Sequence, residues 1–280
     1  MAGLSVTVLV DNATLIDRYF LAEPGFSVYI ESGGKKILFD LGYSDVFLIN
    51  AEKMGVDLLD LDYVALSHGH IDHTGGLVPL MRHHLEAVIE KRPHKKPAII
   101  AHPHCFCPRP SPPLADIGAP VDVVQLARQF PVTTSRVPVW LTDDLVFLGE
   151  IPDYGGCRDN KKRKILLSEG EQLDLLKDDT ALAYRSDTGL VIITGCSHSG
   201  IGTITRYAQE VCGEEKIRDV IGGFHLMGDN PAGIPGTVLE LSRFNPANLH
   251  PCHCTSLGAK IALAKVAPVH EVGVGLKLEY

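Results

Sequence analysis

The 280-residue sequence has no apolar run that approaches the roughly 20 residues needed to cross a bilayer, so we expect no transmembrane helix. It also has no basic excess, because 26 Lys and Arg stand against 34 Asp and Glu and the formal net charge is −8. A general nucleic-acid binder normally carries a basic surplus. The first residues, Met1–Ser5, lack the basic start of a signal peptide. We therefore expect neither a membrane nor a nucleic acid as a partner.

The seven cysteines are an odd number, which does not suit a framework of paired disulfides. Unpaired cysteines are typical of the reducing cytosol, and we expect a cytoplasmic protein. Aromatic residues make up only 6% of the chain, but 45% of it is hydrophobic. This composition suits a compact α/β protein with one large domain or two small ones.

Strand-like and helix-like segments alternate along the chain. Segments rich in β-branched and aromatic residues predict strands at 4–10, 26–30, 36–39, 63–66, 97–101, 145–148, 181–184, 190–194, 218–221 and 248–250. Apolar residues at helical spacing predict helices at 45–54, 74–90, 202–211, 238–244 and 256–266. Residues 103–120 are rich in proline and predict a loop. Residues 153–164 hold the basic cluster Arg158, Lys161, Lys162, Arg163 and Lys164, which predicts either a solvated loop or a flap that meets a substrate phosphate.

The most informative segment is Leu66–Val78, in which His68, His70, Asp72 and His73 fall within six positions after a strand-like run. Neutral imidazole and carboxylate are good ligands for zinc, manganese or iron. In an extended segment, residues two apart point the same way, so His68 and His70 can reach one metal ion. Asp72 and His73 lie where the chain turns into a helix and can hold a second ion. The alternative is a polar turn with chance histidines, since the chain has 13 of them.

This His-x-His-x-Asp-His segment resembles the signature of the metallo-β-lactamase superfamily. The resemblance implies an α/β fold, the αββα sandwich of two mixed sheets flanked by helices, with a metal site at one edge. Members of that superfamily are mostly hydrolases of esters, amides, thioesters and phosphodiesters. Such a sandwich would take residues 1–280 as a single domain.

Other segments are similar to the branch of the superfamily that is named after 7,8-dihydropterin-6-methyl-4-(β-D-ribofuranosyl)aminobenzene 5′-phosphate synthase. The similar segments are Val8–Asn12, Gly149–Pro152, Asp178–Asp179, Ile193–Ile201, Ile221–Leu226 and Pro251–Thr255. That synthase condenses a dihydropterin diphosphate with a ribofuranosyl-aminobenzene phosphate. The resemblance implies a small phosphorylated or pterin-like substrate, and a homo-oligomer is compatible with it.

The resemblance also implies that later histidines complete the metal site, and His198 and His253 each follow a predicted strand. We assign two divalent metal ions, the first to His68, His70 and His198, and the second to Asp72, His73 and His253. Zinc is the metal we expect, with manganese and iron as alternatives. For the two late histidines, the alternative is a structural role with hydrogen bonds to the backbone.

Cys196 marks a departure from the superfamily pattern. Many members carry a bridging aspartate in a Thr-Gly-Asp segment, and the corresponding segment here is Thr194–Cys196. Cys196 is therefore either an extra ligand, which would favour zinc, or a small buried residue. We expect catalytic roles for Asp72, which would orient the reacting group, and for His225, which ends another predicted strand. For His225 we consider proton transfer, substrate contact, or ligation in place of His253.

Asp11 and Asn12 end the first predicted strand. They are candidates for substrate binding, or for a hydrogen bond to a ligand histidine that would fix its orientation. The alternative is a strand-ending turn, because Asp and Asn both suit turns.

Four residues near the predicted ligands are not expected to bind metal. Cys252 and Cys254 flank His253, and strand alternation would point both away from the site, so we expect them to pack. His102 and His104 follow the strand predicted at 97–101, and we expect a structural role for both.

Three functions are consistent with these residues. The first is a metal-dependent enzyme, hydrolase or dihydropterin-condensing transferase, that acts on a small phosphorylated or pterin-like molecule. The second is a generic metal-dependent hydrolase of esters or phosphodiesters. The third is a non-catalytic metal or redox sensor that uses Cys196 and its neighbours, which would require an exposed, reactive thiolate. The first two need the same ligands, so the ligand residues do not separate them.

Overall fold

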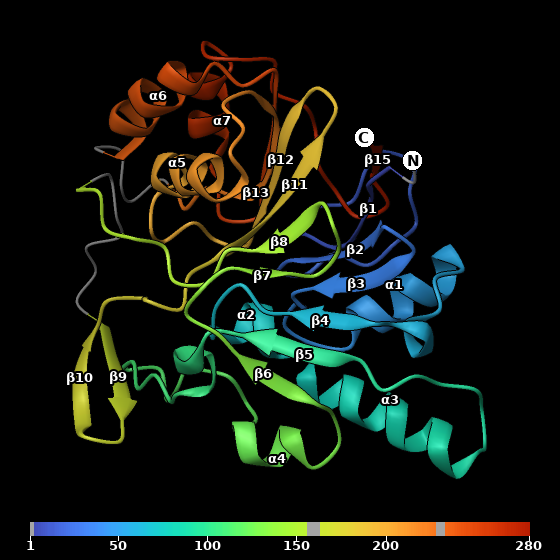
Figure 1. Cartoon of the computed structure of the whole chain (residues 1–280). Helices are drawn as coiled ribbons and strands as arrows, with labels where there is room; N and C mark the ends of the chain where they lie inside the picture. The colour runs from blue at the N-terminus through green and yellow to red at the C-terminus, as the bar shows by residue number, and fades with distance from the viewer. Residues whose placement is uncertain (1–2, 156–162, 228–232) are drawn as a thin grey trace.

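The computed structural model describes residues 3–155, 163–227 and 233–280, and in it two β-sheets pack face to face with helices on both outer faces (Figure 1). This is the αββα sandwich that the resemblance to the superfamily implied. The helices are α1 (Val46–Met54), α2 (Ile71–Thr74), α3 (Leu77–Ile89), α4 (Val123–Ala127), α5 (Ile201–Cys212), α6 (Gly233–Phe244) and α7 (Leu257–Leu263). Short 3₁₀ turns lie at Leu58–Asp60 and Pro103–Phe106.

The first sheet has the strand order β15-β1-β2-β3-β4-β5-β6 and joins both ends of the chain. In that order its strands are Lys277–Glu279, Ser5–Val10, Ser27–Ser32, Lys35–Phe39, Tyr63–Ala65, Ala98–Ala101 and Val132–Thr134. From β15 to β3 the strands pair antiparallel, and from β3 to β6 they pair parallel. The sheet is therefore mixed, as predicted.

The second sheet has the order β14-β13-β12-β11-β8-β7. In that order its strands are Asn248–Cys252, Ile217–Gly223, Gly189–Thr194, Ala181–Ser186, Leu145–Phe147 and Val139–Trp140. Strands β12, β13 and β14 pair parallel, and the other pairs are antiparallel. A separate hairpin consists of β9 (Arg163–Leu167) and β10 (Gly170–Asp174).

Alternation along the strands supplies the core on both sides of each sheet. In β3, Ile37 and Phe39 face the other sheet and pack in one cluster with Phe147 of β8. Leu38, between them, faces the opposite way and packs beneath α1 and α3. A third cluster joins the second sheet to α5, α6 and α7 through residues such as Ile204. Three apolar layers thus hold the sandwich together.

Parallel strands leave their carboxyl ends at the same edge of a sheet, and this geometry assembles the site. His68 and His70 follow β4, whereas Cys196 and His198 follow β12 and His253 follows β14. Donor atoms from these loops come within 4.8 Å of one another, so the carboxyl ends of both sheets meet at one edge of the sandwich.

The prediction of one helix at 74–90 was wrong about where that helix begins. The structure has the short helix α2 at Ile71–Thr74 and then α3 from Leu77, with Gly75 and Gly76 between them. A Cβ atom at Gly75 would overlap the carbonyl oxygen of Tyr43, and one at Gly76 would overlap that of Leu41. The two glycines therefore let the chain pass close to its neighbour just after the histidine motif.

Of the predicted basic loop, Arg158, Lys161 and Lys162 lie outside the described residues. Arg163 and Lys164 begin strand β9, a hairpin strand that the sequence did not predict. Among the described residues, no helix is both long enough and apolar enough to cross a bilayer.

Candidate metal centre

The loops after β4 and β12 bring three histidines together. Donor nitrogens of His68, His70 and His198 all lie within 4.8 Å of one another. The distance between His68 Nε2 and His70 Nδ1 is 3.0 Å, and the His198 ring centroid lies 4.9 Å from the centroids of both rings. All three side chains are buried. The structure therefore assembles the first predicted ligand set.

Asp72, His73, Cys196 and His253 form a second group whose donor atoms also lie within 4.8 Å of one another. His73 Nε2 lies 3.1 Å from Cys196 Sγ and 3.2 Å from His253 Nε2. Asp72 Oδ2 lies 3.4 Å from His253 Nε2. The second predicted set is thus assembled, and Cys196 joins it. The two sets are adjacent, because the ring centroids of His68 and His73 are 4.3 Å apart.

The chemistry of the first set fits a divalent metal ion. Burial lowers the pKa of both His68 and His70, so their imidazoles are neutral and offer a lone pair. His70 Nε2 is buried and has no hydrogen-bond partner among the described residues. Nitrogen, oxygen and sulfur donors of the kinds found in the two sets are those that zinc prefers. The role of these residues as metal ligands stays a prediction.

The second set combines a carboxylate with a protonated imidazole. Burial raises the pKa of Asp72, but His73 and His253 outweigh burial and hold it below its usual value. Burial lowers the pKa of His73, but Asp72 and Asp40 raise it to about 9. A cation bound at His73 Nε2 would take the place of that proton, so loading of the second set would release a proton.

Asp40, which follows β3, supports both ligand sets. One of its carboxylate oxygens, Oδ2, lies 2.7 Å from His73 Nδ1 and accepts a hydrogen bond from Ser67 Oγ at 2.6 Å. Ser67 Oγ in turn lies 2.9 Å from His68 Nδ1. A carboxylate on Nδ1 leaves Nε2 free for a metal ion and fixes the ring orientation. This role was not predicted from the sequence, in which the only signal is an aspartate at the end of a strand.

A buried ion triad supports the loop between His68 and His70. Asp178 Oδ2 accepts hydrogen bonds from the Gly69 amide at 2.8 Å and from Arg109 Nη2 at 2.6 Å. Arg109 Nε donates to Asp174 at 2.9 Å. All three charged side chains are buried. Arg109 and Asp174 were not singled out from the sequence, because only the fold brings them to the histidine loop.

Asp11 and Asn12 both contact His253. Asp11 Oδ1 accepts a hydrogen bond from the His253 amide at 2.9 Å, and Asn12 Oδ1 lies 3.0 Å from His253 Nδ1. This is the predicted alternative in which the pair orients a ligand histidine. Asn12 also lines the cavity beside the ligands, so a contact with substrate stays open for it.

Cys254 lies in the site, and the prediction that it packs away was wrong. Its Sγ belongs to a third group of donors within 4.8 Å, together with Cys196 and His225. Strand β14 ends at Cys252 and His253 has a φ of 51°, so strand alternation does not extend to Cys254. Cys252 does pack in the core between the sheets, as predicted.

The Cys254 thiol differs electrostatically from its neighbour. Burial raises the pKa of Cys254, but a hydrogen bond from Cys196 and the nearby His253 and His225 lower it below the usual thiol value. Burial raises the pKa of Cys196. His225 lies beside the first ligand set, with its ring centroid 4.2 Å from that of His198. Among the three roles predicted for His225, this position is compatible with each.

Four non-glycine residues adopt left-handed backbone conformations at strand ends around the site. Asp40, Ser197, His225 and His253 have φ between 51° and 58° and follow β3, β12, β13 and β14 in turn. Such conformations are uncommon outside glycine and cluster at functional sites. The chain therefore changes direction at each of these strand ends.

His102 and His104 lie outside the donor groups, as predicted. His102 Nε2 lies 3.2 Å from Glu150 Oε2, and His102 Nδ1 accepts a hydrogen bond from the His104 amide. His104 Nε2 lies 3.1 Å from Arg136 Nη2. Both rings therefore have structural partners beside the site.

A cavity of about 550 Å³ opens over the two ligand sets. Its lining includes Asp72, His198, His225 and His253. The apolar side chains Ile71, Ile117 and Met227 and the basic side chain of Arg163 complete much of the wall. A cavity of this size suits a small molecule.

Residues 21–201 match the family model described as the metallo-beta-lactamase superfamily. The chain is 32% identical, over 92% of its length and 90% of the relative's, to the 7,8-dihydropterin-6-methyl-4-(beta-D-ribofuranosyl)-aminobenzene-5'-phosphate synthase of Methanocaldococcus jannaschii. It is 27% identical to a second protein of that organism, MJ0448, over 93% and 94% of the two chains. The crystal structure of Tm1679, a metal-dependent hydrolase of the beta-lactamase superfamily, aligns over 99% of both chains with a TM-score of 0.83 and 29% identity. The chain therefore belongs to the metallo-beta-lactamase superfamily of metal-dependent enzymes.

Proposed function

We infer that this protein is a metal-dependent enzyme that acts on a small phosphorylated, pterin-like molecule. The two adjacent sets of candidate metal ligands at the floor of one cavity of about 550 Å³ carry this inference. The likeness to the M. jannaschii synthase over nearly the whole chain supports the pterin-like class.

The cavity wall suits a flat ring with an attached phosphate. Ile71, Ile117 and Met227 offer apolar surface on which a heteroaromatic ring can pack. Arg163 supplies a guanidinium, which binds phosphate oxygens through paired N–H groups. The lining therefore combines the two kinds of contact that a phosphorylated pterin substrate needs.

In a condensation, the bonds that break and form would lie above the two ligand sets. The C–O bond between the pterin methylene and its diphosphate breaks, a C–N bond forms to the aniline nitrogen, and that nitrogen loses a proton. Divalent metal ions held by the two sets would neutralise the charge of the departing diphosphate. Arg163 would bind phosphate oxygens, and His225 lines the same cavity and could accept the proton at a ring nitrogen.

Hydrolysis of a phosphate ester or diester is the second candidate, and the likeness to the hydrolase Tm1679 favours it. In that case Asp72 would orient the attacking water, and the same lining would bind the phosphate. The sensor hypothesis gains no support from Cys196, because Cys196 is 4% exposed and burial raises the pKa of its thiol.

The test begins with metal analysis of freshly purified protein. The protein is then loaded separately with zinc, manganese and iron. Each form is assayed for condensation of the dihydropterin diphosphate with the ribofuranosyl-aminobenzene phosphate, and for hydrolysis of bis(p-nitrophenyl) phosphate. Coupled product and diphosphate release would support the condensation, and turnover of the diester alone would favour the hydrolase. Protein that takes up none of these metals would refute both candidates.

A pair of variants tests the phosphate contact separately. Arg163→Gln should raise KM for a phosphorylated substrate by about tenfold, because it removes a charge-assisted hydrogen bond. Lys164→Gln on the same strand is the matched control, since Lys164 pairs with Glu171 of β10 and does not line the cavity. An equal KM in both variants would remove Arg163 from the substrate site.

A further inference from the structure

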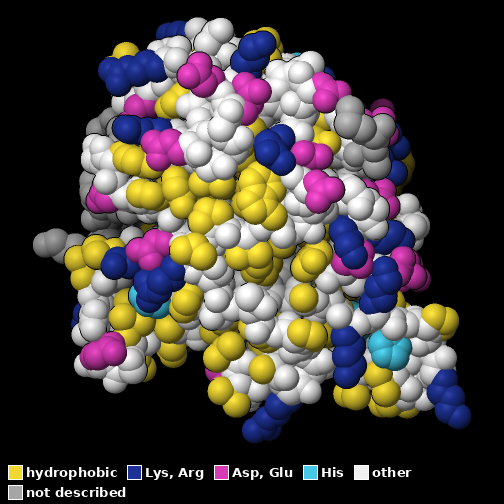
Figure 2. All heavy atoms as spheres, in the orientation of Figure 1, with side chains coloured by type: hydrophobic (Ala, Val, Ile, Leu, Met, Phe, Trp, Pro, Cys, Tyr) yellow, Lys and Arg dark blue, Asp and Glu magenta, His cyan; other side chains and the backbone are white. Residues whose placement is uncertain are grey.

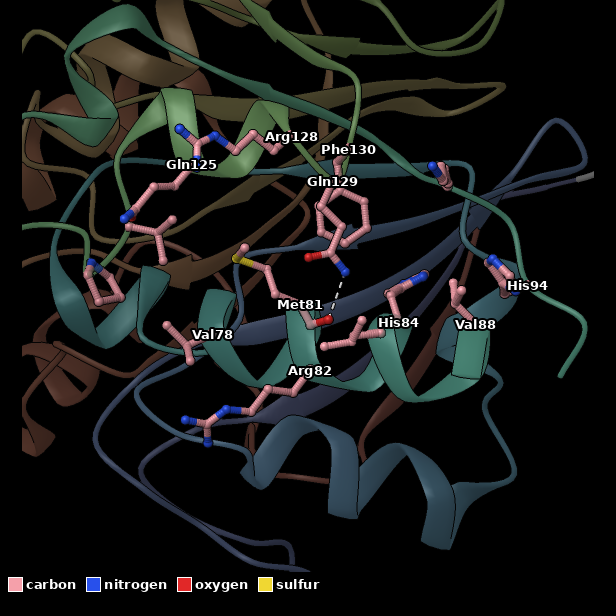
Figure 3. Close-up of a pocket in the computed structure, with 14 residues that line it drawn as sticks. Val78, Met81, Arg82, His84, Val88, His94, Gln125, Arg128, Gln129 and Phe130 are labelled. Carbon is pink, nitrogen blue, oxygen red and sulfur yellow. Dashed lines mark hydrogen bonds between the residues drawn. The ribbon is translucent and has the colours of Figure 1, made fainter. Parts of the chain in front are cut away.

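A second cavity, of about 680 Å³, lies between α3 and the segment that contains α4 (Figure 3). We call it the α3–α4 cavity. It shares no lining residue with the cavity over the ligand sets. Its walls are connected by a hydrogen bond from Gln129 Nε2, just after α4, to the Met81 carbonyl oxygen of α3 at 2.7 Å.

The lining of the α3–α4 cavity combines apolar and basic side chains. Val78, Met81, Val121 and Phe130 contribute apolar wall. Arg82, Lys96 and Arg128 contribute positive charge, and none of the described lining residues is Asp or Glu. Figure 2, drawn in the orientation of Figure 1, shows yellow apolar and dark blue basic side chains together over the lower part of the molecule, where α3 and α4 lie. The cavity therefore has the charge of a site for an anion, although the chain as a whole carries a formal net charge of −8.

His84 of α3 is the polar group at the inner wall of this cavity. Its side chain is 2% exposed, and neither ring nitrogen has a hydrogen-bond partner among the described residues. Its ring lies edge-on to Phe130, 5.0 Å between centroids, and 6.4 Å from the ring of His94. Figure 3 shows His84 between Phe130 and His94 on the side of α3 that faces the cavity.

A buried imidazole without partners is costly, because one nitrogen offers a donor and the other an acceptor. Burial, with His83 and His94 nearby, lowers the pKa of His84 to about 4, so the ring is neutral at pH 7. A neutral imidazole can both donate and accept one hydrogen bond. A carboxylate oxygen of a ligand would accept the hydrogen bond of the N–H nitrogen, while the apolar part of the ligand covers Phe130 and Met81.

We propose that the α3–α4 cavity binds a small amphiphilic anion, an apolar molecule with one acidic group, at a site separate from the metal centre. The apolar body packs against Met81 and Phe130, a polar group bonds to His84, and the basic lining balances the negative charge. This inference does not depend on the proposed function, because it rests on residues of another cavity.

The first test uses the intact protein and the fluorescent sulfonate 1-anilinonaphthalene-8-sulfonate as probe. Displacement is measured with decanoate and with 1-decanol, which has the same chain length and no charge. Decanoate should displace the probe at roughly tenfold lower concentration than 1-decanol, because a charge-assisted contact distinguishes the two. Absence of probe binding, or equal displacement by both compounds, would overturn the proposal.

Variants then locate the site. The double variant Lys96→Gln/Arg128→Gln should weaken decanoate binding by about tenfold or more. The matched control Arg243→Gln/Lys265→Gln changes the net charge equally at exposed positions outside the cavity lining and should bind like the wild type. Equal weakening in both double variants would show that only net charge matters and would overturn the proposal.

The ring of His84 gives a direct readout. In protein with ¹³C-labelled histidine, decanoate should shift the His84 ring signals, identified by their absence from the variant His84→Phe, and should leave those of His68 and His198 unchanged.

Sedimentation velocity tests the other possible occupant. A dimer that the Lys96→Gln/Arg128→Gln variant dissociates would assign this surface to a second copy of the chain and overturn the proposal.

Discussion

Both cavities have buried histidine in their lining, but the groups around it carry opposite charge. At the metal centre, Asp40 lies against His73 and Asp72 lies close to His253. At the α3–α4 cavity, His84 has other histidines as its polar neighbours, and the described lining contains cations without carboxylates. Histidine is thus surrounded by groups that favour a cation at the metal centre, and by groups that favour an uncharged or anionic ligand at the α3–α4 cavity.

The comparison shows that burial alone does not mark a metal site. Burial lowers the pKa of His68, His70 and His84 alike. The metal centre differs because several imidazoles and a carboxylate converge on one place. In addition, Asp40 lies against Nδ1 of His73 and Asn12 against Nδ1 of His253, which fixes the orientation of both rings. His84 belongs to no such group of converging donors among the described residues.

The largest expected effect is that of His68→Ala, which breaks the metal centre and leaves the other cavity intact. Metal content should fall, and turnover should drop by about a thousandfold or more, because the first set loses a central donor. Metal analysis and activity measured together test this, with His84→Ala and the exposed His270→Ala as controls that should keep their metal. Unchanged metal stoichiometry in His68→Ala would refute the ligand assignment.

The next largest effect should come from Arg109→Met in the buried triad behind the His68 loop. Removal of the guanidinium leaves Asp174 and Asp178 as buried, unpaired carboxylates, which should cost roughly 3–5 kcal/mol of unfolding free energy. Urea denaturation gives the value. The exposed pair of Arg185 and Asp144 is the comparison, and Arg185→Met should cost less than about 1 kcal/mol. Similar losses in the two variants would mean that the triad does not support the loop.

A smaller effect is expected from Asp40→Asn, which removes the carboxylate that lies against His73 and that His84 lacks. Metal affinity should fall roughly 10- to 100-fold, because His73 loses the partner that fixes its ring. Chelator competition measures this change, and decanoate binding at the α3–α4 cavity serves as the internal reference and should not move. The control Asp60→Asn alters an exposed carboxylate that pairs with Lys36 and Lys95. Retained affinity in Asp40→Asn would mean that the convergence of donors suffices without the outer carboxylate.

The parts of the site that are adjacent in the sequence could be predicted from it. His68, His70, Asp72 and His73 lie in one loop after a strand, and their spacing alone indicated two directions of ligation. His198 needed the resemblance as well as its place after a strand. The supporting residues could not be found in this way, since Asp178 contacts Gly69 across 109 positions. No local pattern encodes such a contact, because the folded sheets create it.

The sandwich was implied by the resemblance of the histidine motif, whereas the positions of most strands and helices followed from alternation and helical spacing. The errors fall at special backbone positions. Gly75 and Gly76 interrupt a helix whose apolar spacing runs on past them, and the left-handed conformation at His253 ends the alternation that would have turned Cys254 away. Hydrophobic spacing carries no information about either feature.

The smallest expected effect is on the pH dependence of stability, and it distinguishes the His84 environment from an exposed histidine. The folded-state pKa of His84 is about 4, below its ordinary value of 6.5. Below pH 6.5 the unfolded chain binds a proton that the folded chain does not take up, so stability is lost as the pH falls from 6.5 towards 4, and nothing is lost above 6.5.

His84→Leu removes this proton uptake, so its unfolding free energy should fall about 2 kcal/mol less than that of the wild type between pH 7 and pH 4.5. Urea denaturation at several pH values gives both profiles. The metal-centre histidines are identical in the two proteins, so their contribution cancels in the difference. His270→Leu, at an exposed position, should follow the wild type. If His84→Leu also followed the wild type, the ring nitrogens of His84 would already have hydrogen-bond partners. The α3–α4 cavity would then lack the unsatisfied imidazole that distinguishes it from the metal centre.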